Sequence, residues 1–228
     1  MKQIYLWLIP FFLFAAQTMA QTMAQTMAQT MAQTMAQEER KPLTTTDAFQ
    51  EQLKKASADM HSIEADFRQE KYLSVFAETI ASTGRFYYRP ANKIRLEYTD
   101  PISYLMVINE SQLKIVADGK SNVVTLGSNP MMQEMKNLIA ASMVGDLAAL
   151  SAGYTTHLFE TSSAYIAEIE PKSASARNYI QKITLTFSKK DMSVTTLRLA
   201  ESADDYTEYH FTNRKYNTLH SDELFAIP

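Results

Sequence analysis

Most of the chain alternates apolar and polar side chains with a period of two, which is typical of strands that bury one face. The alternation is clearest in residues 80–88 and 94–98, where Phe86, Tyr88, Leu96 and Tyr98 share the apolar phase. Similar stretches occur at 105–108, 113–117, 123–126, 165–169, 179–187, 194–199 and 206–211, and the alternation begins near Ile63. We expect about eight to eleven antiparallel strands joined by short turns.

Two segments show the spacing of an amphipathic helix instead. Residues 44–60 place Phe49, Leu53 and Met60 along one side. Residues 129–145 open with an Asn-Pro pair, which suits a helix cap followed by the first helical position. The second helix would be an insertion between two groups of strands.

An apolar stripe on the second predicted helix is rich in methionine. Its members are Met131, Met132, Met135, Leu138, Ile139 and Met143. Methionine is unbranched and adaptable, so such a stripe suits a surface that repacks around ligands of variable shape. The alternative is a core-facing helix that uses methionine to fill gaps.

Many short strands with only five glycines predict a mainly antiparallel α+β fold. We expect a strongly curved sheet, or incomplete barrel, with helices over one side; a closed barrel is the alternative. The concave side of such a sheet is either filled by its own side chains or left as an apolar cavity.

The first 36 residues have the features of an export signal. Met1-Lys2 is followed by thirteen apolar residues, Ile4 to Ala16, a stretch too short to span a bilayer. Gln-Thr-Met-Ala then repeats five times up to Ala36, and every copy ends in a small-x-small cleavage pattern. We predict a cleaved signal peptide at 1–36, a single domain at 37–228 and a periplasmic location.

Composition and charge argue against several classes of function. The chain has no cysteine, so the exported protein is neither disulfide-linked nor a lipoprotein itself. A net charge of -3 without a basic cluster argues against nucleic acid as a partner. The four histidines, His61, His157, His210 and His220, lack metal-ligand spacing, and we expect neither a metal nor a cofactor.

Candidate catalytic groups are few. Glu168 and Glu170 share one face of a predicted strand, and a hydrolase that uses Glu168 or His210 is one hypothesis. A solvated strand face explains the two carboxylates better. No phosphate loop or nucleophile elbow is present, so we expect a protein that is not an enzyme.

Four runs of sequence together resemble the LolA family of periplasmic outer-membrane lipoprotein carriers. They are residues 67–69 (FRQ), 84–90 (GRFYYRP), 93–101 (KIRLEYTDP) and 224–228 (LFAIP). The chain departs from the family at Leu96, where Trp is usual, and at Asn109-Glu110-Ser111, where an Asp-Gly turn is usual. Leu96 still offers an apolar side chain, and Asn tolerates the positive φ that a tight turn needs. The chain is similar to a divergent member.

The resemblance implies an unclosed antiparallel β-barrel with a helical lid over an apolar cavity that shelters lipoprotein acyl chains. Phe86, Tyr88, Leu96, Tyr98 and the methionine stripe would line the cavity, and Arg89 would latch the lid by donating to its carbonyls. The implied partners are acylated lipoproteins, an ABC-type release complex in the inner membrane and an outer-membrane acceptor, with the carrier a monomer. A sensor or accessory module that binds another lipid-like ligand without delivering lipoproteins is the alternative.

Overall fold

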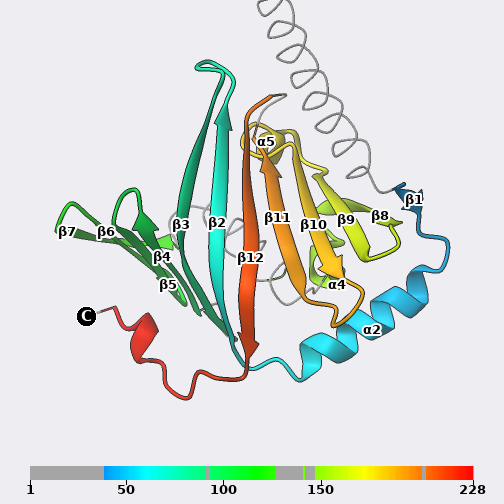
Figure 1. The fold of residues 1–228 in the computed structure, drawn as a ribbon, viewed down its shortest axis with the longest axis horizontal. Coiled ribbons are helices and arrows are strands. Elements are labelled where there is room, and N and C mark those ends of the chain that lie inside the picture. Colours follow the sequence, from blue (N-terminus) through cyan, green and yellow to red (C-terminus); the bar gives the residue numbers. More distant parts are fainter. Residues whose placement is uncertain (1–38, 91–92, 127–140, 142–146, 202–203, 228) are drawn as a thin grey trace, which may run out of the picture. The chain divides into compact units, whose positions relative to one another are not determined.

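The computed structural model of the protein describes residues 39–90, 93–126, 141, 147–201 and 204–227. Contacts within the chain set Lys41–Pro228 apart as a compact unit. This unit is built on one large antiparallel sheet with a few short helices (Figure 1). None of the helices in the described ranges has the length and apolarity that crossing a bilayer requires.

Twelve strands make up the sheet in the described part of the chain. They are β1 (Lys41–Pro42), β2 (Ile63–Leu73), β3 (Glu78–Arg89), β4 (Lys93–Asp100), β5 (Tyr104–Asn109), β6 (Gln112–Ala117), β7 (Lys120–Thr125), β8 (Tyr154–Glu160), β9 (Ala164–Pro171), β10 (Lys182–Ser188), β11 (Val194–Ala200) and β12 (Tyr206–Tyr216). The helices are α2 (Thr46–Ala58), α4 (Leu147–Leu150), α5 (Ala174–Arg177) and the 3-10 turn η2 (Glu223–Phe225).

The sheet is not closed. Its strand order is β1-β8-β9-β10-β11-β12-β2-β3-β4-β5-β6-β7, and all neighbouring strands are antiparallel. The two ends of the order, β1 and β7, lie on opposite sides of the sheet in Figure 1. The predicted incomplete barrel is therefore confirmed, and the closed barrel is wrong.

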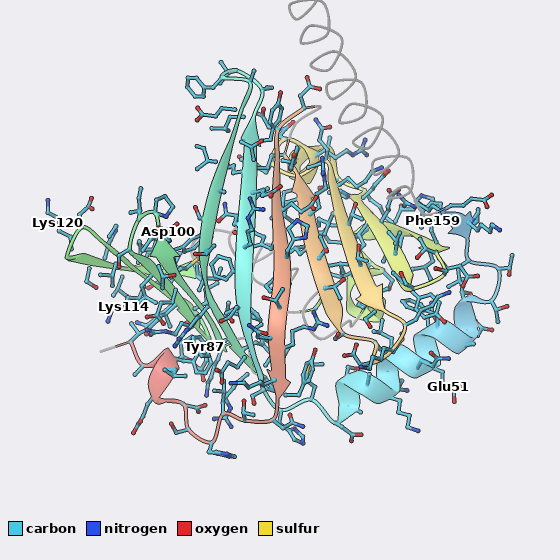
Figure 2. All side chains as sticks on the ribbon, in the orientation of Figure 1. Glu51, Tyr87, Asp100, Lys114, Lys120 and Phe159 are labelled. Carbon is cyan, nitrogen blue, oxygen red and sulfur yellow. The ribbon has the colours of Figure 1, made fainter. Side chains whose placement is uncertain are left out.

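The predicted first helix is confirmed as α2, and it covers one end of the apolar face. Phe49 and Leu53 are buried in it, whereas Glu51 between them is exposed and points away from the sheet (Figure 2). The ring centroid of Phe49 lies 4.9 Å from that of Tyr165 and 5.8 Å from that of Phe187. Contacts of this kind stabilise a helix that is too short to be stable alone. The sequence pattern therefore marked both the helix and the side that it buries.

The predicted strands are confirmed, with two differences. The sheet has one strand more than the upper estimate. Two of its strands, β1 and β8, have no counterpart among the predicted stretches, because β1 has only two residues and β8 mixes apolar and polar residues. The stretch predicted from Tyr179 becomes a strand only at Lys182, since the amides of Tyr179 and Ile180 both donate to the carbonyl of Ala176 at 3.0 Å. The predicted lid helix at 129–145 lies outside the described residues except for Ala141.

The turn after β5 differs in detail from the expectation. Asn109 belongs to the strand and pairs with Gln112, so the positive φ falls on Glu110, at 52°. Asp118 and Gly119 form the turn between β6 and β7, with φ values of 49° and 72°. Two-residue hairpin loops favour such left-handed residues because their twist matches that of the flanking strands.

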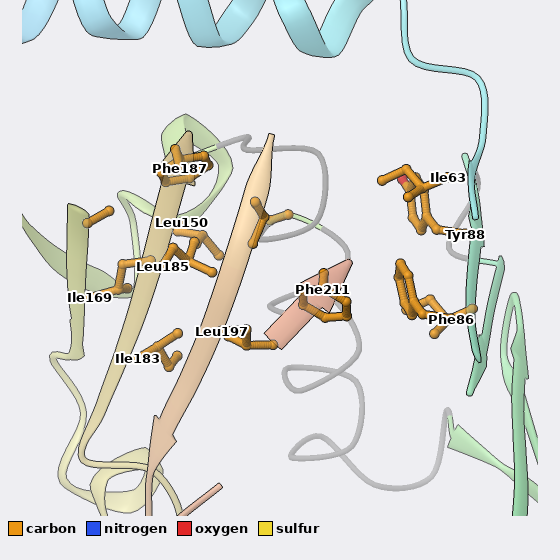
Figure 3. Packing of buried hydrophobic residues seen from close by; sticks show 14 of the residues in the cluster. Ile63, Phe86, Tyr88, Leu150, Ile169, Ile183, Leu185, Phe187, Leu197 and Phe211 are labelled. Atoms are coloured by element: carbon orange, nitrogen blue, oxygen red, sulfur yellow. The ribbon is translucent and has the colours of Figure 1, made fainter. Parts of the chain in front are cut away.

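One face of the sheet carries the main core. Alternate residues from both halves of the sheet point toward each other across it (Figure 3). The labelled members are Ile63, Phe86, Tyr88, Leu150, Ile169, Ile183, Leu185, Phe187, Leu197 and Phe211. Each large apolar side chain buried in this way contributes about 1.5–3 kcal/mol to stability. We call this side of the sheet the concave face.

A smaller core lies on the opposite, convex face of β3 to β5. There Phe225 is fully buried against Tyr87 and Val107. We call residues 217–227, which supply Phe225, the C-terminal strap. Arg95 Nη1 donates to the carbonyl of Leu224 at 3.1 Å, and Asn109 Nδ2 donates to that of Phe225 at 3.1 Å. The strap is thus held by apolar burial and by side-chain bonds to its backbone.

Gly84 allows two aromatic rings to pack over the middle of the concave face. It pairs with Phe67 on one side and Tyr98 on the other, and the centroids of these two rings are 5.0 Å apart. A Cβ at this position would lie 2.7 Å from Phe67 Cζ and would clash with the backbone oxygen of Glu97. The sheet accepts only glycine here.

We expect the Gly84→Ala variant to be destabilised by about 2–4 kcal/mol, because the backbone of β4 would have to move. Gly153→Ala is the matched control, since nothing lies within 4 Å of its added Cβ. Urea unfolding of the two variants, followed by circular dichroism, gives the comparison. Equal stability of the two would show that the close approach at Gly84 is unimportant.

Candidate ligand-binding face

Four of the predicted cavity residues lie together on the concave face. Phe86 and Tyr88 of β3 and Leu96 of β4 are buried there, and Tyr98 is half-buried. Phe86 pairs directly with Leu96, and Tyr98 pairs with Gly84 one step along the ladder. The shared phase of the alternation dictates this arrangement, because residues two apart point to the same side.

The other predicted lining residues lie outside the described part of the chain. They are Met131, Met132, Met135, Leu138, Ile139 and Met143. Their contact with the concave face stays a prediction. Within the described ranges, however, Met60, Met106 and Met192 all pack in the main core. Adaptable methionine side chains therefore do line the concave face.

The aromatic surface is larger than the sequence predicted. The ring of Phe67 lies 5.7 Å from that of Tyr209, and the ring of Phe86 lies 5.5 Å from that of Phe211. Tyr104 extends the group, 5.5 Å from Tyr98. Phe67, Tyr104, Tyr209 and Phe211 are thus four additional positions. Tyr209 and Phe211 lie two apart in the predicted strand 206–211, but only the pairing of β12 with β2 brings them to this site. We call Phe67, Phe86, Tyr98, Tyr104, Tyr209 and Phe211 the aromatic cluster.

The cluster contains a pair of hydroxyl groups that bond to each other. Tyr98 Oη and Tyr209 Oη are 3.0 Å apart. Burial raises the pKa of Tyr98, and burial raises the pKa of Tyr209 well above its ordinary value. Both phenols therefore stay neutral at physiological pH, and one hydroxyl donates a hydrogen bond to the other. The surface thus offers apolar rings without an ionised group at its centre.

One end of the concave face is polar. Glu201 accepts a bond from Thr207 Oγ1 at 2.7 Å and forms an ion pair with Lys71 at 3.1 Å. Beside them, Gln69 Oε1 is buried and has no hydrogen-bond partner among the described residues. A buried acceptor without a partner costs about 1–3 kcal/mol, so this oxygen can bind a ligand donor favourably. The face therefore joins an apolar region to a polar end.

The described side chains of the concave face leave a small space between them. A cavity of about 20 Å³ lies among residues of β2, β3, β11 and β12, including Ile63, Phe86 and Phe211. That volume holds roughly one water molecule. This space is too small for an acyl chain, and the apolar cavity implied by the resemblance stays a prediction.

Arg89 lies on the other side of β3, in phase with Tyr87. Its Nη1 donates to Asp222 Oδ1 of the strap at 2.6 Å, and Lys93 Nζ donates to Asp222 Oδ2 at 2.5 Å. The bond from Lys93, together with the charge of Arg89, lowers the pKa of Asp222. The strap contact is therefore complete above the ordinary carboxyl pKa and is lost as the pH falls through the lowered value. The predicted contact of Arg89 with lid carbonyls involves residues outside the described ranges and stays a prediction.

The groups considered for hydrolysis do not meet the aromatic cluster. Lys182 Nζ lies 3.3 Å from Glu168 Oε2 and 3.5 Å from Glu170 Oε1, and His210 Nε2 lies 2.9 Å from Glu208 Oε1. These side chains are on the convex face, out of phase with Ile169 and Phe211. Within the described ranges, no three His, Asp or Glu residues form a possible metal site. The carboxylates are accounted for as ion-pair partners.

Comparisons with known proteins agree with the sequence resemblance. The family model described as outer membrane lipoprotein carrier protein LolA matches residues 58–228. No curated protein matches the chain in sequence.

Several solved structures are similar at low identity. A LolA superfamily protein from Nitrosomonas europaea is 12% identical, with a TM-score of 0.42, over 78% of this chain and 97% of that one. The lipoprotein LppX of Mycobacterium tuberculosis is 11% identical, with a TM-score of 0.44, over 76% and 96%. A structure of the MucA/MucB complex of Pseudomonas aeruginosa is 13% identical, with a TM-score of 0.37, over 79% and 60%.

A double-mutant cycle measures how much the hydrogen bond between the Tyr98 and Tyr209 hydroxyls contributes to stability. We expect Tyr98→Phe and Tyr209→Phe each to cost about 1–2 kcal/mol, because each leaves one buried hydroxyl without its partner. The double variant should cost less than the sum, with a coupling of about 0.5–1.5 kcal/mol by urea unfolding. Tyr179→Phe, at a tyrosine that is 55% exposed, is the control and should be nearly neutral. Strictly additive losses would show that the hydroxyl pair is not formed in solution.

Proposed function

The chain belongs to the LolA family of outer membrane lipoprotein carrier proteins, and on this premise we propose that it is a periplasmic carrier. It shelters the acyl chains of lipoproteins and transfers them from the inner to the outer membrane. The proposed donor is an ABC-type release complex, and the proposed recipient is an outer-membrane acceptor. The predicted signal peptide at 1–36, which lies outside the described residues, would bring the protein to this compartment.

The aromatic cluster on the concave face is the observation that supports this proposal most. Burial of each CH₂ group of an acyl chain contributes about 0.8 kcal/mol of favourable transfer free energy. An acyl chain therefore binds to an apolar surface in preference to staying in water. Rings from β2, β3, β4, β5 and β12 offer one continuous apolar surface against which such a chain can lie. At the polar end of this face, Gln69 Oε1 can accept a bond from an amide of the acylated end.

Transfer requires that the cargo also leave. The rings of the aromatic cluster pack on one another, so an acyl chain that separates them replaces contacts that the empty carrier makes with itself. The binding free energy is then a difference between two sets of apolar contacts, which keeps it moderate. Adaptable methionines, Met60, Met106 and Met192 among them, suit cargo of varied shape. Phe86, Tyr88, Leu96 and Tyr98 remain our proposed lining, together with the methionine stripe.

The carrier function predicts uptake of an apolar dye whose fluorescence rises in a dry environment. We expect an acylated lipoprotein or a long-chain lipid to displace the dye. Met135→Glu should abolish uptake while the circular dichroism spectrum stays native, because a carboxylate in an apolar site is strongly disfavoured. Val123→Glu, on the exposed edge strand β7, is the matched control and should bind dye normally.

Delivery is tested by loading the protein with an acylated lipoprotein and then adding vesicles that contain the acceptor. Native mass spectrometry reports the loaded species, and flotation reports transfer. Uptake followed by transfer supports the carrier. Uptake without transfer would overturn delivery and favour the accessory module that binds a lipid-like ligand.

Arg89 provides a second prediction because two roles for it give different results. If Arg89 latches the lid, Arg89→Leu should alter loading and hand-over unequally, and Asp222→Asn should leave both steps unchanged. If Arg89 only braces the strap through its 2.6 Å bond to Asp222, the two variants should behave alike. The two steps are followed separately in the lipoprotein assay, with unfolding curves as the check on folding. Equal effects on both steps, or none, would exclude a latch.

A further inference from the structure

The β2–β3 hairpin extends beyond the strands on either side of it. The pairing of β2 with β12 stops at Tyr72 and that of β3 with β4 stops at Thr83, whereas β2 and β3 remain paired up to Leu73 and Glu78. Figure 1 shows this hairpin projecting past its neighbours. We call residues 74–82 the hairpin tip.

The tip is apolar and exposed. Val75 is 80% exposed, Phe76 is 71% exposed and Ile80 is 45% exposed. From Ser74 to Gly84 the sequence contains one charged residue, Glu78. Single exposed apolar residues are ordinary, but a projecting group of them on a soluble surface indicates an interaction site.

Side chains of β11, β12 and Asp205 hold the base of the hairpin. Asp205 Oδ1 accepts bonds from the amide and the hydroxyl of Ser74 at 2.7 and 2.6 Å. The ring of Tyr72 stacks on that of Tyr206 at 5.6 Å, and the guanidinium of Arg198 lies 3.6 Å above the second ring. These contacts fix the base of the hairpin. The exposed side chains are therefore presented by a braced element.

We propose that the hairpin tip inserts into the surface of a lipid bilayer, with Phe76 and Val75 as the groups that enter it. A projecting tip of three apolar side chains cannot bury the roughly 800 Å² per partner of a stable protein interface, but it suits a soft lipid surface. The order of side chains from the tip to the base of the hairpin also suits a lipid surface. Apolar side chains come first, the tyrosines Tyr72 and Tyr206 follow at headgroup level, and the charged pair Lys71 and Glu201 lies behind them.

Charge at the tip determines which lipids it meets. The tip has no basic residue, while Glu78 is part of it and Asp205 lies at its base. Attraction to anionic headgroups therefore contributes nothing, and insertion is driven by apolar contact. Binding should occur on zwitterionic vesicles and should change little with salt. The inference stands apart from the carrier proposal, because it concerns the unloaded protein.

The test uses a single tryptophan as the reporter. Trp7 is the one tryptophan of the sequence and lies ahead of the compact unit Lys41–Pro228. The protein is recovered after export, with loss of the leader checked by mass. In the Phe76→Trp variant, we expect a blue shift of emission on adding phosphatidylcholine vesicles, and quenching when the acyl chains are brominated. A Val123→Trp variant, on strand β7, is the matched reporter and should show neither effect.

Flotation of the otherwise unchanged protein completes the test. The Val75→Ser/Phe76→Ser double variant should bind phosphatidylcholine vesicles at least about tenfold more weakly than the parent. Val123→Ser should bind like the parent, and all proteins should unfold at the same temperature, since the replaced side chains are exposed. Unquenched emission from the Phe76→Trp variant, or equal binding by the double variant, would overturn the proposal. Failure of the parent to bind would overturn it equally and leave lipoprotein loading as a separate question.

Discussion

The antiparallel pairing of β12 with β2 is the interaction on which the candidate site depends. It places Phe211 opposite Phe67 and Tyr209 opposite Gln69, although these strands come from the two ends of the domain's sequence. Without it, β2–β7 would form one smaller sheet and β1 with β8–β12 another, each with an exposed apolar face. Joined edge to edge, they bury those faces against each other. The aromatic cluster lies along this junction.

The curvature that turns the joined sheet into a concave surface has local causes. The ladder of β2 with β12 shifts register between Thr212 and Lys215, and that of β3 with β4 shifts at Gly84. Bulges of this kind increase twist and bend the strand that contains them. Asn213, inside the first bulge, has a φ of 51° and donates from Nδ2 to Asp66 Oδ2 at 2.7 Å. One shift lies where the two halves meet, between β12 and β2, and the other lies between β3 and β4.

The two faces of the sheet carry different kinds of side chain. The concave face holds apolar rings and a polar end, whereas the convex face near β3 and β4 holds the strap through Arg89, Lys93 and Arg95. This division keeps the charged groups that hold the strap away from the aromatic cluster. It also means that a structural change on the convex face reaches the aromatic cluster only through the backbone of β3 and β4.

The sequence by itself determined the class of fold, the positions of most strands and the helix α2, because both periodicities arise from local backbone geometry. It also determined that Phe86, Tyr88, Leu96 and Tyr98 share one face, since residues two apart along a strand and paired across a hairpin must do so. The matching runs between 67 and 101 further indicated the family. Only the tertiary structure decided that Tyr209 and Phe211 join them and that Arg89 meets Asp222. Those features depend on which distant strands pair and how far the sheet bends, and no local pattern of apolar and polar residues specifies either.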